Sequence, residues 1–374
     1  MKILIYSPVF YPMIGGMETV TECMAELFIQ EGHECKVVTP VKYAGADQYS
    51  FKVYREPDFM HKIRLILWAD IVYSNGATLA LLPLVKILRR PYAWTHVGYQ
   101  ASCIDGLGWV DGEPAPIDPI GSIKYHWKKR GLSYTVIGAL KLFIRRFVAN
   151  YMVDLNIAIT DWVAKRQPFK KQVKIYNPTP LDRFRTPSKV SDIEYDFVYL
   201  GRLVSEKGVS TLLNALHQLN NNKTETKRKL LIIGDGDLRK ELERISTSLG
   251  IAEEVTFAGK KSGQELTDLI HSARIAVIPS DWEEPMGVVA LELMAAGRNI
   301  IVSENGGLQE CVGEAGLAFP NRDAKALSDC MHQLLTNTEL ASKKRERGQL
   351  QIQKFEPRGL ARQYLAAFNS IVKN

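Results

Sequence analysis

The sequence lacks several features that define whole classes of protein. It has five cysteines among 374 residues and no Cys-x-x-Cys pair, which argues against a disulfide scaffold and a cysteine metal site. No apolar run reaches the length of about 18 residues that a membrane span needs. The first apolar segment begins at residue 2 without a basic region before it, so no signal peptide is predicted. We therefore expect a protein of the reducing cytoplasm.

The composition is that of an ordinary globular protein, but its charge is uneven. Residues 1–185 contain 24 Lys and Arg against 16 Asp and Glu, a net +8, whereas residues 186–374 contain 24 against 25, a net −1. This asymmetry predicts an anionic partner for the first half. A solvated basic surface without such a partner is the alternative. No nucleic-acid-binding motif is present, so nucleic acid is not expected as that partner.

Both halves of the chain alternate short apolar runs with helical patterns. The first half opens with an apolar run at Lys2–Phe10, then a Pro/Gly loop and a helix. The second half repeats this order with a strand at Tyr195–Leu200, a loop and a helix at Val209–Leu219. Such alternation predicts parallel sheets covered by helices on both faces. We expect an α/β protein of two Rossmann-like domains, divided near the prolines at residues 178 and 180.

Two glycine-containing loops follow predicted strands. Gly15 and Gly16 precede a helix, where glycine lets the backbone approach a phosphate and the helix N-terminus supplies free N–H groups. The loop Gly201–Gly208 carries Arg202 and Lys207. Arginine binds phosphate oxygens bidentately and lysine adds a point charge, so this loop predicts a phosphate site. A surface loop with chance charges is the alternative.

A third segment places two carboxylates around a helix start. Glu284 precedes a Pro/Gly turn, the helix begins near Gly287 and Val288, and Glu292 lies inside it. The helix N-terminus can hold a diphosphate while the carboxylates bind hydroxyl groups on either side of it. An exposed helix residue is the alternative for Glu292 alone.

A histidine and a basic helical region complete the candidates. His96 ends a strand of the first half, where it either contacts substrate or has a structural role. Residues 121–150 combine aromatic and apolar residues with cations that include Lys128, Lys129 and Arg130, a pattern typical of interfacial membrane binding. The alternative is a helix whose apolar face packs in the core. No His, Cys, Asp and Glu cluster has the spacing of a metal site, so no metal is expected.

Taken together, the motifs Gly15-Gly16-x-Glu18, Gly201-Arg202-Leu203-x-x-Glu206-Lys207-Gly208 and Glu284-Pro285-Met286-Gly287-x4-Glu292 resemble those of the retaining glycosyltransferases of family four. The resemblance covers essentially the whole chain. It implies the GT-B fold, in which two Rossmann-like domains face each other across a cleft. Residues 1–177 would bind the acceptor and residues 178–356 the nucleotide-sugar donor. The last helix, residues 357–374, would pack back on the first domain.

The resemblance also implies roles for individual residues. Arg202 and Lys207 would bind the donor diphosphate, Glu292 the ribose hydroxyls, and Glu284 the transferred sugar. Backbone contacts to the donor would come from glycine-rich positions and one helix start, namely Gly15, Gly16, Gly201, Gly287 and Val288. His96 would lie beside the sugar. No metal or cofactor would be needed besides the donor, which is expected to be a UDP- or GDP-linked sugar.

We therefore expect a retaining glycosyltransferase of the hexosyltransferase type. Its acceptor would be a glycan or a lipid-linked molecule in the synthesis of cell-surface polysaccharide, lipopolysaccharide or glycolipid. Contact with the anionic inner face of the cell membrane would make it a peripheral membrane protein. Two alternatives remain open: a catalytically idle scaffold that binds nucleotide sugars, and a nucleotide-sugar epimerase of the same fold. Donor turnover with and without acceptor separates the three.

Overall fold

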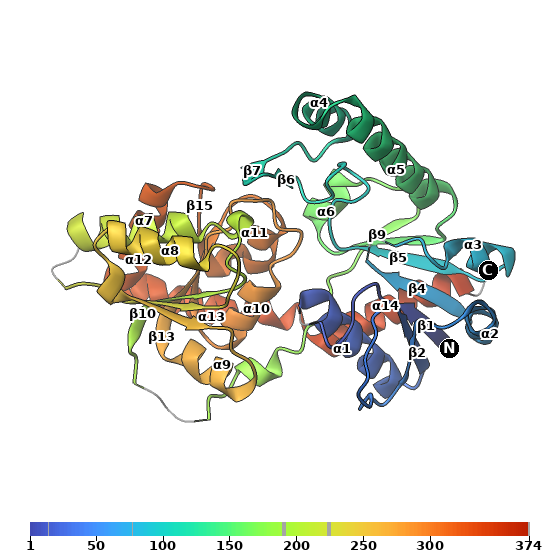
Figure 1. Cartoon of the computed structure of the whole chain (residues 1–374). Coiled ribbons are helices and arrows are strands. Elements are labelled where there is room, and N and C mark those ends of the chain that lie inside the picture. The colour runs from blue at the N-terminus through green and yellow to red at the C-terminus, as the bar shows by residue number, and fades with distance from the viewer. Residues whose placement is uncertain (14, 77, 189–191, 223–225, 373–374) are drawn as a thin grey trace. The chain divides into compact units, whose positions relative to one another are not determined.

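The computed structural model describes residues 1–13, 15–76, 78–188, 192–222 and 226–372 (Figure 1). The chain divides into two compact units. The first unit comprises Met1–Val110, Ala115–Pro180 and Phe355–Asn374, and the second comprises Asp111–Pro114 and Leu181–Lys354. Each unit is built on a parallel sheet with helices, so the expected class of two Rossmann-like α/β domains is confirmed. The chain passes between the units after Pro180 and after Lys354, and the short segment Asp111–Pro114 falls in the second unit.

The first unit contains a seven-stranded parallel sheet in the order β3-β2-β1-β4-β5-β8-β9. Its strands are β1 (Lys2–Tyr6), β2 (Glu34–Thr39), β3 (Lys52–Arg55), β4 (Ile71–Asn75), β5 (Tyr92–His96), β8 (Leu155–Ala158) and β9 (Gln172–Lys174). Its helices are α1 (Gly16–Gln30), α2 (Phe59–Trp68), α3 (Leu82–Ile87), α4 (Pro119–Arg130), α5 (Leu132–Tyr151), α6 (Asp161–Arg166) and α14 (Pro357–Val372). The short strands β6 (Trp109–Val110) and β7 (Glu113–Pro114) lie between β5 and α4 in the sequence.

Both faces of this sheet are buried, which explains why its central strands are continuously apolar. Ile3, Leu4 and Ile5 of β1 are fully buried, although alternate side chains point to opposite faces. The last helix, α14, packs against α1 and contributes Phe368 to the core on one face. Its Tyr364 hydroxyl hydrogen-bonds the Asn177 Oδ1 at 3.0 Å. The C-terminal helix therefore belongs to the first unit, although the second unit precedes it in the sequence.

The second unit contains a six-stranded parallel sheet in the order β12-β11-β10-β13-β14-β15. Its strands are β10 (Tyr195–Leu200), β11 (Leu230–Ile233), β12 (Val255–Gly259), β13 (Ala273–Ile278), β14 (Asn299–Ser303) and β15 (Gly316–Phe319). Its helices are α7 (Val209–Asn222), α8 (Arg239–Ser248), α9 (Gly263–His271), α10 (Val288–Ala295), α11 (Gly307–Val312), α12 (Ala324–Thr336) and α13 (Thr338–Gln353). The strand order reverses between β10 and β13, and ligands of open α/β sheets bind beyond the carboxyl ends of the strands at such a reversal.

The basic region at residues 121–150 forms two helices rather than one. Gly131, with φ +83°, separates α4 from α5, a backbone conformation that favours glycine. Helix α5 buries Leu142, Val148 and Ala149 but leaves most of its larger apolar side chains exposed. This exposure contradicts the alternative in which the apolar face of the helix packs in the core. Among the described residues, no helix combines the length and apolarity required to span a membrane.

Candidate functional site

Two predicted loops of the second unit meet at the reversal of strand order. The loop after β10 contains a single 3-10 turn at Ser205–Lys207 and ends at Gly208, with φ +64°. A Cβ on Gly208 would lie 2.0 Å from the carbonyl oxygen of Pro279, which follows β13. The two loops are also joined by a hydrogen bond of 3.0 Å, from the Asp281 N–H to the Glu206 carbonyl. Glycine at position 208 is therefore required for the loops to approach this closely.

Lys207 and Glu284 form an ion pair between these two loops. Lys207 Nζ lies 2.8 Å from Glu284 Oε1, and the side chains are only 18% and 10% exposed. The Ser280 hydroxyl donates a hydrogen bond to the same carboxylate oxygen, and the ammonium lies 5.6 Å from the centre of the Trp282 ring. Charges with so little water around them interact more strongly than surface charges. The pair therefore holds a cation in a fixed position at the edge of the sheet.

Arg202 is the more exposed cation of the same loop. Its side chain is 70% exposed and makes a single-nitrogen contact of 3.3 Å with Glu206. The backbone beneath it is fixed, because the Tyr199 hydroxyl donates to the Arg202 carbonyl at 2.8 Å. Burial raises the pKa of Tyr199, so its phenol stays protonated and remains a donor. The loop thus presents one fixed cation and one that is able to reorient toward an anion.

The start of α10 provides backbone donors beside these cations. Gly287 is the N-cap residue, and no side chain caps the helix. A Cβ on Gly287 would lie 2.6 Å from the Leu308 side chain, so the turn is closely packed on α11. A helix start without a capping side chain leaves N–H groups directed at an incoming anion. The Gly287 N–H already donates to the Cys311 Sγ at 3.4 Å, so of the two predicted donors only that of Val288 has no such contact to a side chain among the described residues, and the contact of both with a donor stays a prediction.

Glu292 is a buried carboxylate on the second turn of α10. The residue is 9% exposed, and its Oε1 lies 3.2 Å from Nη2 of Arg183, which is itself half exposed. Burial raises the pKa of Glu292, although the Arg183 guanidinium acts in the opposite direction. A poorly hydrated carboxylate gains more from a hydroxyl donor than one in water does. The geometry is compatible with binding of vicinal hydroxyls.

The remaining predicted residues belong to the first unit. Gly15 is the N-cap of α1 and Gly16 its first residue, and both are exposed. Lys128, Lys129 and Arg130 form the exposed last turn of α4. Their proposed roles stay predictions, because the structure contains no ligand.

His96 differs from these exposed residues, because only 3% of it is accessible. It lies between the rings of Trp94 and Phe169 and hydrogen-bonds the Asn156 Oδ1 through Nε2 at 2.9 Å. Burial lowers the pKa of His96 to about 4, so the imidazole is neutral near pH 7. The structural interpretation of this histidine accounts for all of these contacts, and its position beside a sugar stays a prediction.

Sequence reasoning missed three residues of the second unit's site. Arg183 contacts Glu292 from a position 109 residues away, which no local pattern reveals. Ser280 and Trp282 lie in the same loop as Glu284, and only their nearness to Glu284 in the sequence could have indicated that they belong to the site. The indole Nε1–H of Trp282 is buried and has no hydrogen-bond partner among the described residues.

Comparisons with known proteins identify the family and the fold. The model of the family described as glycosyl transferases group 1 matches residues 182–351. An uncharacterized glycosyltransferase of Methanocaldococcus jannaschii is 40% identical over 329 residues, covering 81% of this chain and 80% of that protein. A lipopolysaccharide 1,2-N-acetylglucosaminetransferase of Salmonella typhimurium is 29% identical over 46% of this chain and 45% of its own length. The crystal structure of Anabaena HepE with UDP and glucose matches with a TM-score of 0.74 and 18% identity, covering 99% of this chain and all of the other, which supports the GT-B fold.

Proposed function

The chain belongs to the glycosyl transferases of group 1, and from this premise we propose that it transfers a sugar from a nucleotide diphosphate to a glycan or lipid-linked acceptor with retention of configuration. The observation that carries the proposal is the buried pair of Lys207 and Glu284 beside the uncapped start of α10. A cation held in a nearly dry position next to the first N–H groups of a helix is suited to a diphosphate. The carboxylate next to it is suited to sugar hydroxyls.

The proposed mechanism follows the movement of charge during the reaction. Departure of the nucleotide leaves negative charge on the diphosphate and positive character on the sugar carbon. Lys207, Arg202 and the N–H groups of α10 would stabilise the diphosphate without reorganising much, since Lys207 is already in place. Loss of one preorganised donor of this kind typically lowers turnover by about 10²–10³-fold. Glu284 and Glu292 would orient the sugar and the ribose through their hydroxyl groups.

Retention is proposed together with attack by the acceptor on the same face of the sugar that the leaving group departs from. No side chain is assigned as a covalent nucleophile, because the Glu284 carboxylate is engaged by Lys207 and Ser280. The cations of the site would supply the charge that a divalent ion provides in other transferases, so we propose that the reaction needs no metal. Activity that persists in EDTA supports this, and activity restored only by a divalent ion contradicts it.

The proposed donor is UDP- or GDP-linked, of the hexosyl type. Anabaena HepE, crystallised with UDP and glucose, supports a uridine nucleotide, and the Salmonella relative supports an acceptor in cell-surface glycan synthesis. We also propose a cytoplasmic location with peripheral contact to an anionic membrane through the last turn of α4. Its exposed cations, Lys128, Lys129 and Arg130, support that contact.

Thermal stabilisation by UDP, GDP, ADP and dTDP in EDTA tests the donor site. A nucleotide at 100 times its dissociation constant adds about 2.7 kcal/mol to the free energy of unfolding. We expect one nucleotide to raise the melting temperature selectively in the wild type and much less in Lys207→Met. If none of the four stabilises the protein, the diphosphate assignment of Lys207, Arg202 and Glu292 is wrong.

Product analysis then separates the transferase from the two alternatives. A transferase releases nucleotide at a rate that rises with acceptor and joins the sugar to it. An idle scaffold binds the nucleotide sugar without turnover. An epimerase changes the donor without consuming an acceptor.

A further inference from the structure

The outer face of α5 carries a continuous stripe of exposed apolar side chains. Its seven members recur every three or four residues and are each 48–63% exposed: Val136, Ile137, Leu140, Phe143, Ile144, Phe147 and Tyr151. These positions contain no charged residue. Soluble surfaces rarely expose so many large apolar side chains together, and such a face usually contacts a partner or a membrane. We call these seven residues the apolar stripe.

The orientation of α5 is fixed by the opposite side of the helix. The Arg145 guanidinium donates to the Gln100 carbonyl at 3.2 Å, and the Arg146 guanidinium donates to the Ala101 carbonyl at 3.0 Å. Arg146 also lies over the Phe169 ring, while Val148 and Ala149 of α5 are buried in the core. Turning the stripe inward would break these contacts. Its exposure is therefore a built property of the first unit.

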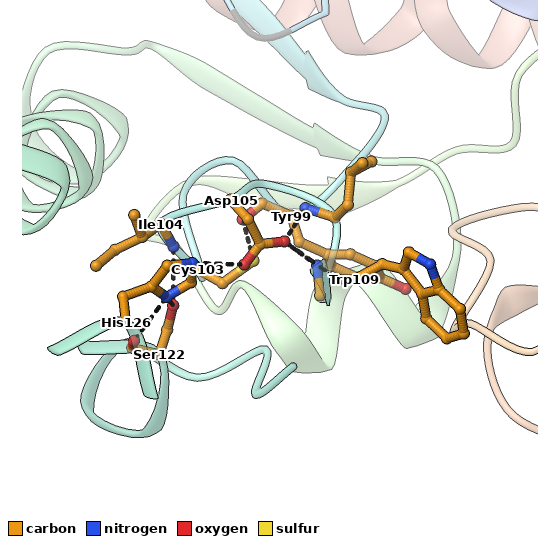
Figure 2. A network of polar contacts seen from close by, with 9 residues as sticks. Tyr99, Cys103, Ile104, Asp105, Trp109, Ser122 and His126 are labelled. Carbon is orange, nitrogen blue, oxygen red and sulfur yellow. Dashed lines mark hydrogen bonds and ion pairs between the residues drawn. The ribbon is translucent and has the colours of Figure 1, made fainter. Parts of the chain in front are cut away.

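Helix α4 is fixed to the same unit by a buried polar network (Figure 2). The Asp105 carboxylate accepts hydrogen bonds from the backbone N–H groups of Leu107 and Trp109, which shape the preceding loop. His126 of α4 uses Nδ1 to donate to the Ser122 carbonyl at 2.9 Å, and its Nε2 lies 3.9 Å from Asp105 Oδ2. This network holds α4 against the loop, while Ile120 and Trp127 on its outer side stay exposed.

The charge of this helix pair defines the chemistry of its partner. Residues 119–151 contain seven Lys and Arg and no Asp or Glu. A second copy of the chain would bring the same seven positive charges against these, which is unfavourable. The partner must therefore be apolar and anionic over a broad area. An anionic lipid bilayer has both properties at its surface.

We propose that the apolar stripe of α5, with Trp127 of α4, inserts into the interface of an anionic bilayer, and that the cations around it bind the headgroups. The apolar insertion, and not the charge of Lys128, Lys129 and Arg130, provides most of the binding free energy. The helix lies in the plane of the interface, because it is too polar to span. The inference deepens the peripheral membrane contact of the proposed function, and it gives that contact a defined surface.

Vesicle binding by the full-length protein tests the proposal. The stripe variant is Leu140→Ser, Phe143→Ser and Phe147→Ser together, and the charge variant is Lys128→Gln, Lys129→Gln and Arg130→Gln together. Leu350→Ser in α13 is the control, since Leu350 is a single exposed apolar residue, 64% accessible, of the second unit. Co-sedimentation is measured with vesicles of phosphatidylcholine alone and with added phosphatidylglycerol. Binding to each kind of vesicle is measured at low salt and at 1 M NaCl, where the attraction between charges is screened beyond about 3 Å.

We expect the wild type to keep much of its binding to phosphatidylglycerol vesicles at 1 M NaCl. The stripe variant should lose at least about 100-fold in affinity at both salt concentrations, because three apolar side chains no longer enter the interface. The charge variant should weaken at low salt and match the wild type at high salt. Leu350→Ser should bind like the wild type. Brominated lipid should quench tryptophan fluorescence more strongly in the wild type than in Trp127→Phe, because only the wild type has the Trp127 indole in the interface.

Three results overturn the proposal. The first is complete loss of wild-type binding at 1 M NaCl, and the second is unchanged binding by the stripe variant. The third is a dimer in light scattering that the stripe variant converts to a monomer, which would assign the stripe to a second copy. Nucleotide-induced stabilisation without vesicles is measured in every variant. Stabilisation equal to that of the wild type shows that a variant is folded. If no nucleotide stabilises even the wild type, the donor site is misassigned, and this result does not depend on vesicle binding.

Discussion

The loops after β10 and β13 of the second unit, which we call the donor loops after their proposed role, depart from the usual pattern of burial. The helix pair α4–α5 of the first unit departs from it in the opposite direction. The charged side chains of Lys207 and Glu284 in the donor loops are largely buried, and so is that of Glu292 on α10. In the helix pair, large apolar side chains such as Phe143 and Leu140 are exposed. Charged residues usually face water and apolar residues usually do not, so each departure costs stability unless a partner compensates it. In both units, the residues for which we propose a function are those whose exposure is opposite to the usual exposure of their residue type.

The two departures also differ in how they are stabilised without a ligand. Lys207 and Glu284 compensate each other's charge, and Arg183 does the same for Glu292. The apolar stripe has no equivalent, because its side chains are about half exposed and no other described element of the first unit covers them. A donor site of this kind is stable before its substrate arrives, whereas the stripe favours association.

Removal of the fixed cation should have the largest effect. We expect Lys207→Met to lower turnover by about 10²–10³-fold, since the developing diphosphate charge loses one preorganised partner. The matched control is Lys261→Met, which breaks an ion pair of 2.5 Å with the exposed Glu265 in the same unit. Steady-state kinetics and circular dichroism on both proteins check the expectation. Near-normal turnover by a folded Lys207→Met protein would falsify the phosphate role.

The close approach of the two donor loops should be the next most sensitive feature. Gly208→Ala adds a Cβ that meets the Pro279 carbonyl, whereas Gly32→Ala adds one at a similar positive φ with nothing within 4 Å. The left-handed backbone alone costs about 1–2 kcal/mol. We expect Gly32→Ala to lose that amount, and Gly208→Ala to lose more and to weaken nucleotide binding as well. Denaturant unfolding with and without nucleotide measures both, and equal losses would show that the loops do not need this contact.

Glu292→Gln should separate binding from stability. Burial raises the pKa of Glu292, so its ionised form is disfavoured in the folded state and its contribution to stability falls as the pH rises through that pKa. The amide removes this cost, and we expect the melting temperature at pH 8 to be unchanged or higher. Nucleotide affinity should fall by about 10–100-fold, because a charge-assisted hydrogen bond is lost. Calorimetric titration checks the affinity, with the exposed Glu339→Gln as control. A lower melting temperature together with unchanged affinity would assign Glu292 a structural role only.

The smallest effect is expected at His96, which is buried and neutral rather than buried and charged. Burial lowers the pKa of His96 to about 4, whereas an ordinary histidine has a pKa near 6.5. The neutral His96 therefore contributes its full share of the free energy of unfolding above pH 6.5, and this contribution is lost as the pH falls toward 4. We expect His96→Gln to reduce the difference in unfolding free energy between pH 7.5 and 5.5 by about 1 kcal/mol. His61→Gln, at an exposed position, should change that difference much less. Identical pH profiles for wild type and His96→Gln would mean that His96 titrates normally.

Much of the second unit was predictable from sequence. β10 was expected at the residues where it is observed, and α10 begins at Val288, where its start was expected. The loops before α7 and α10 were identified as a candidate site from their glycines, their charged residues and the family resemblance. The partners of the charged residues were not predictable, since Lys207 and Glu284 are 77 positions apart and Arg183 and Glu292 are 109 apart.

The sequence by itself determined the two α/β units, the two loops of the candidate site and the excess of positive charge in residues 1–185, because apolar periodicity, glycine and charge act locally. Only the tertiary structure decided which carboxylate each cation meets and on which side of α5 the apolar residues lie. A helix has the same apolar period whether its stripe faces a protein core or a membrane. The anchoring of α5 through Arg145 and Arg146 settles that choice, and it joins residues 45 positions apart.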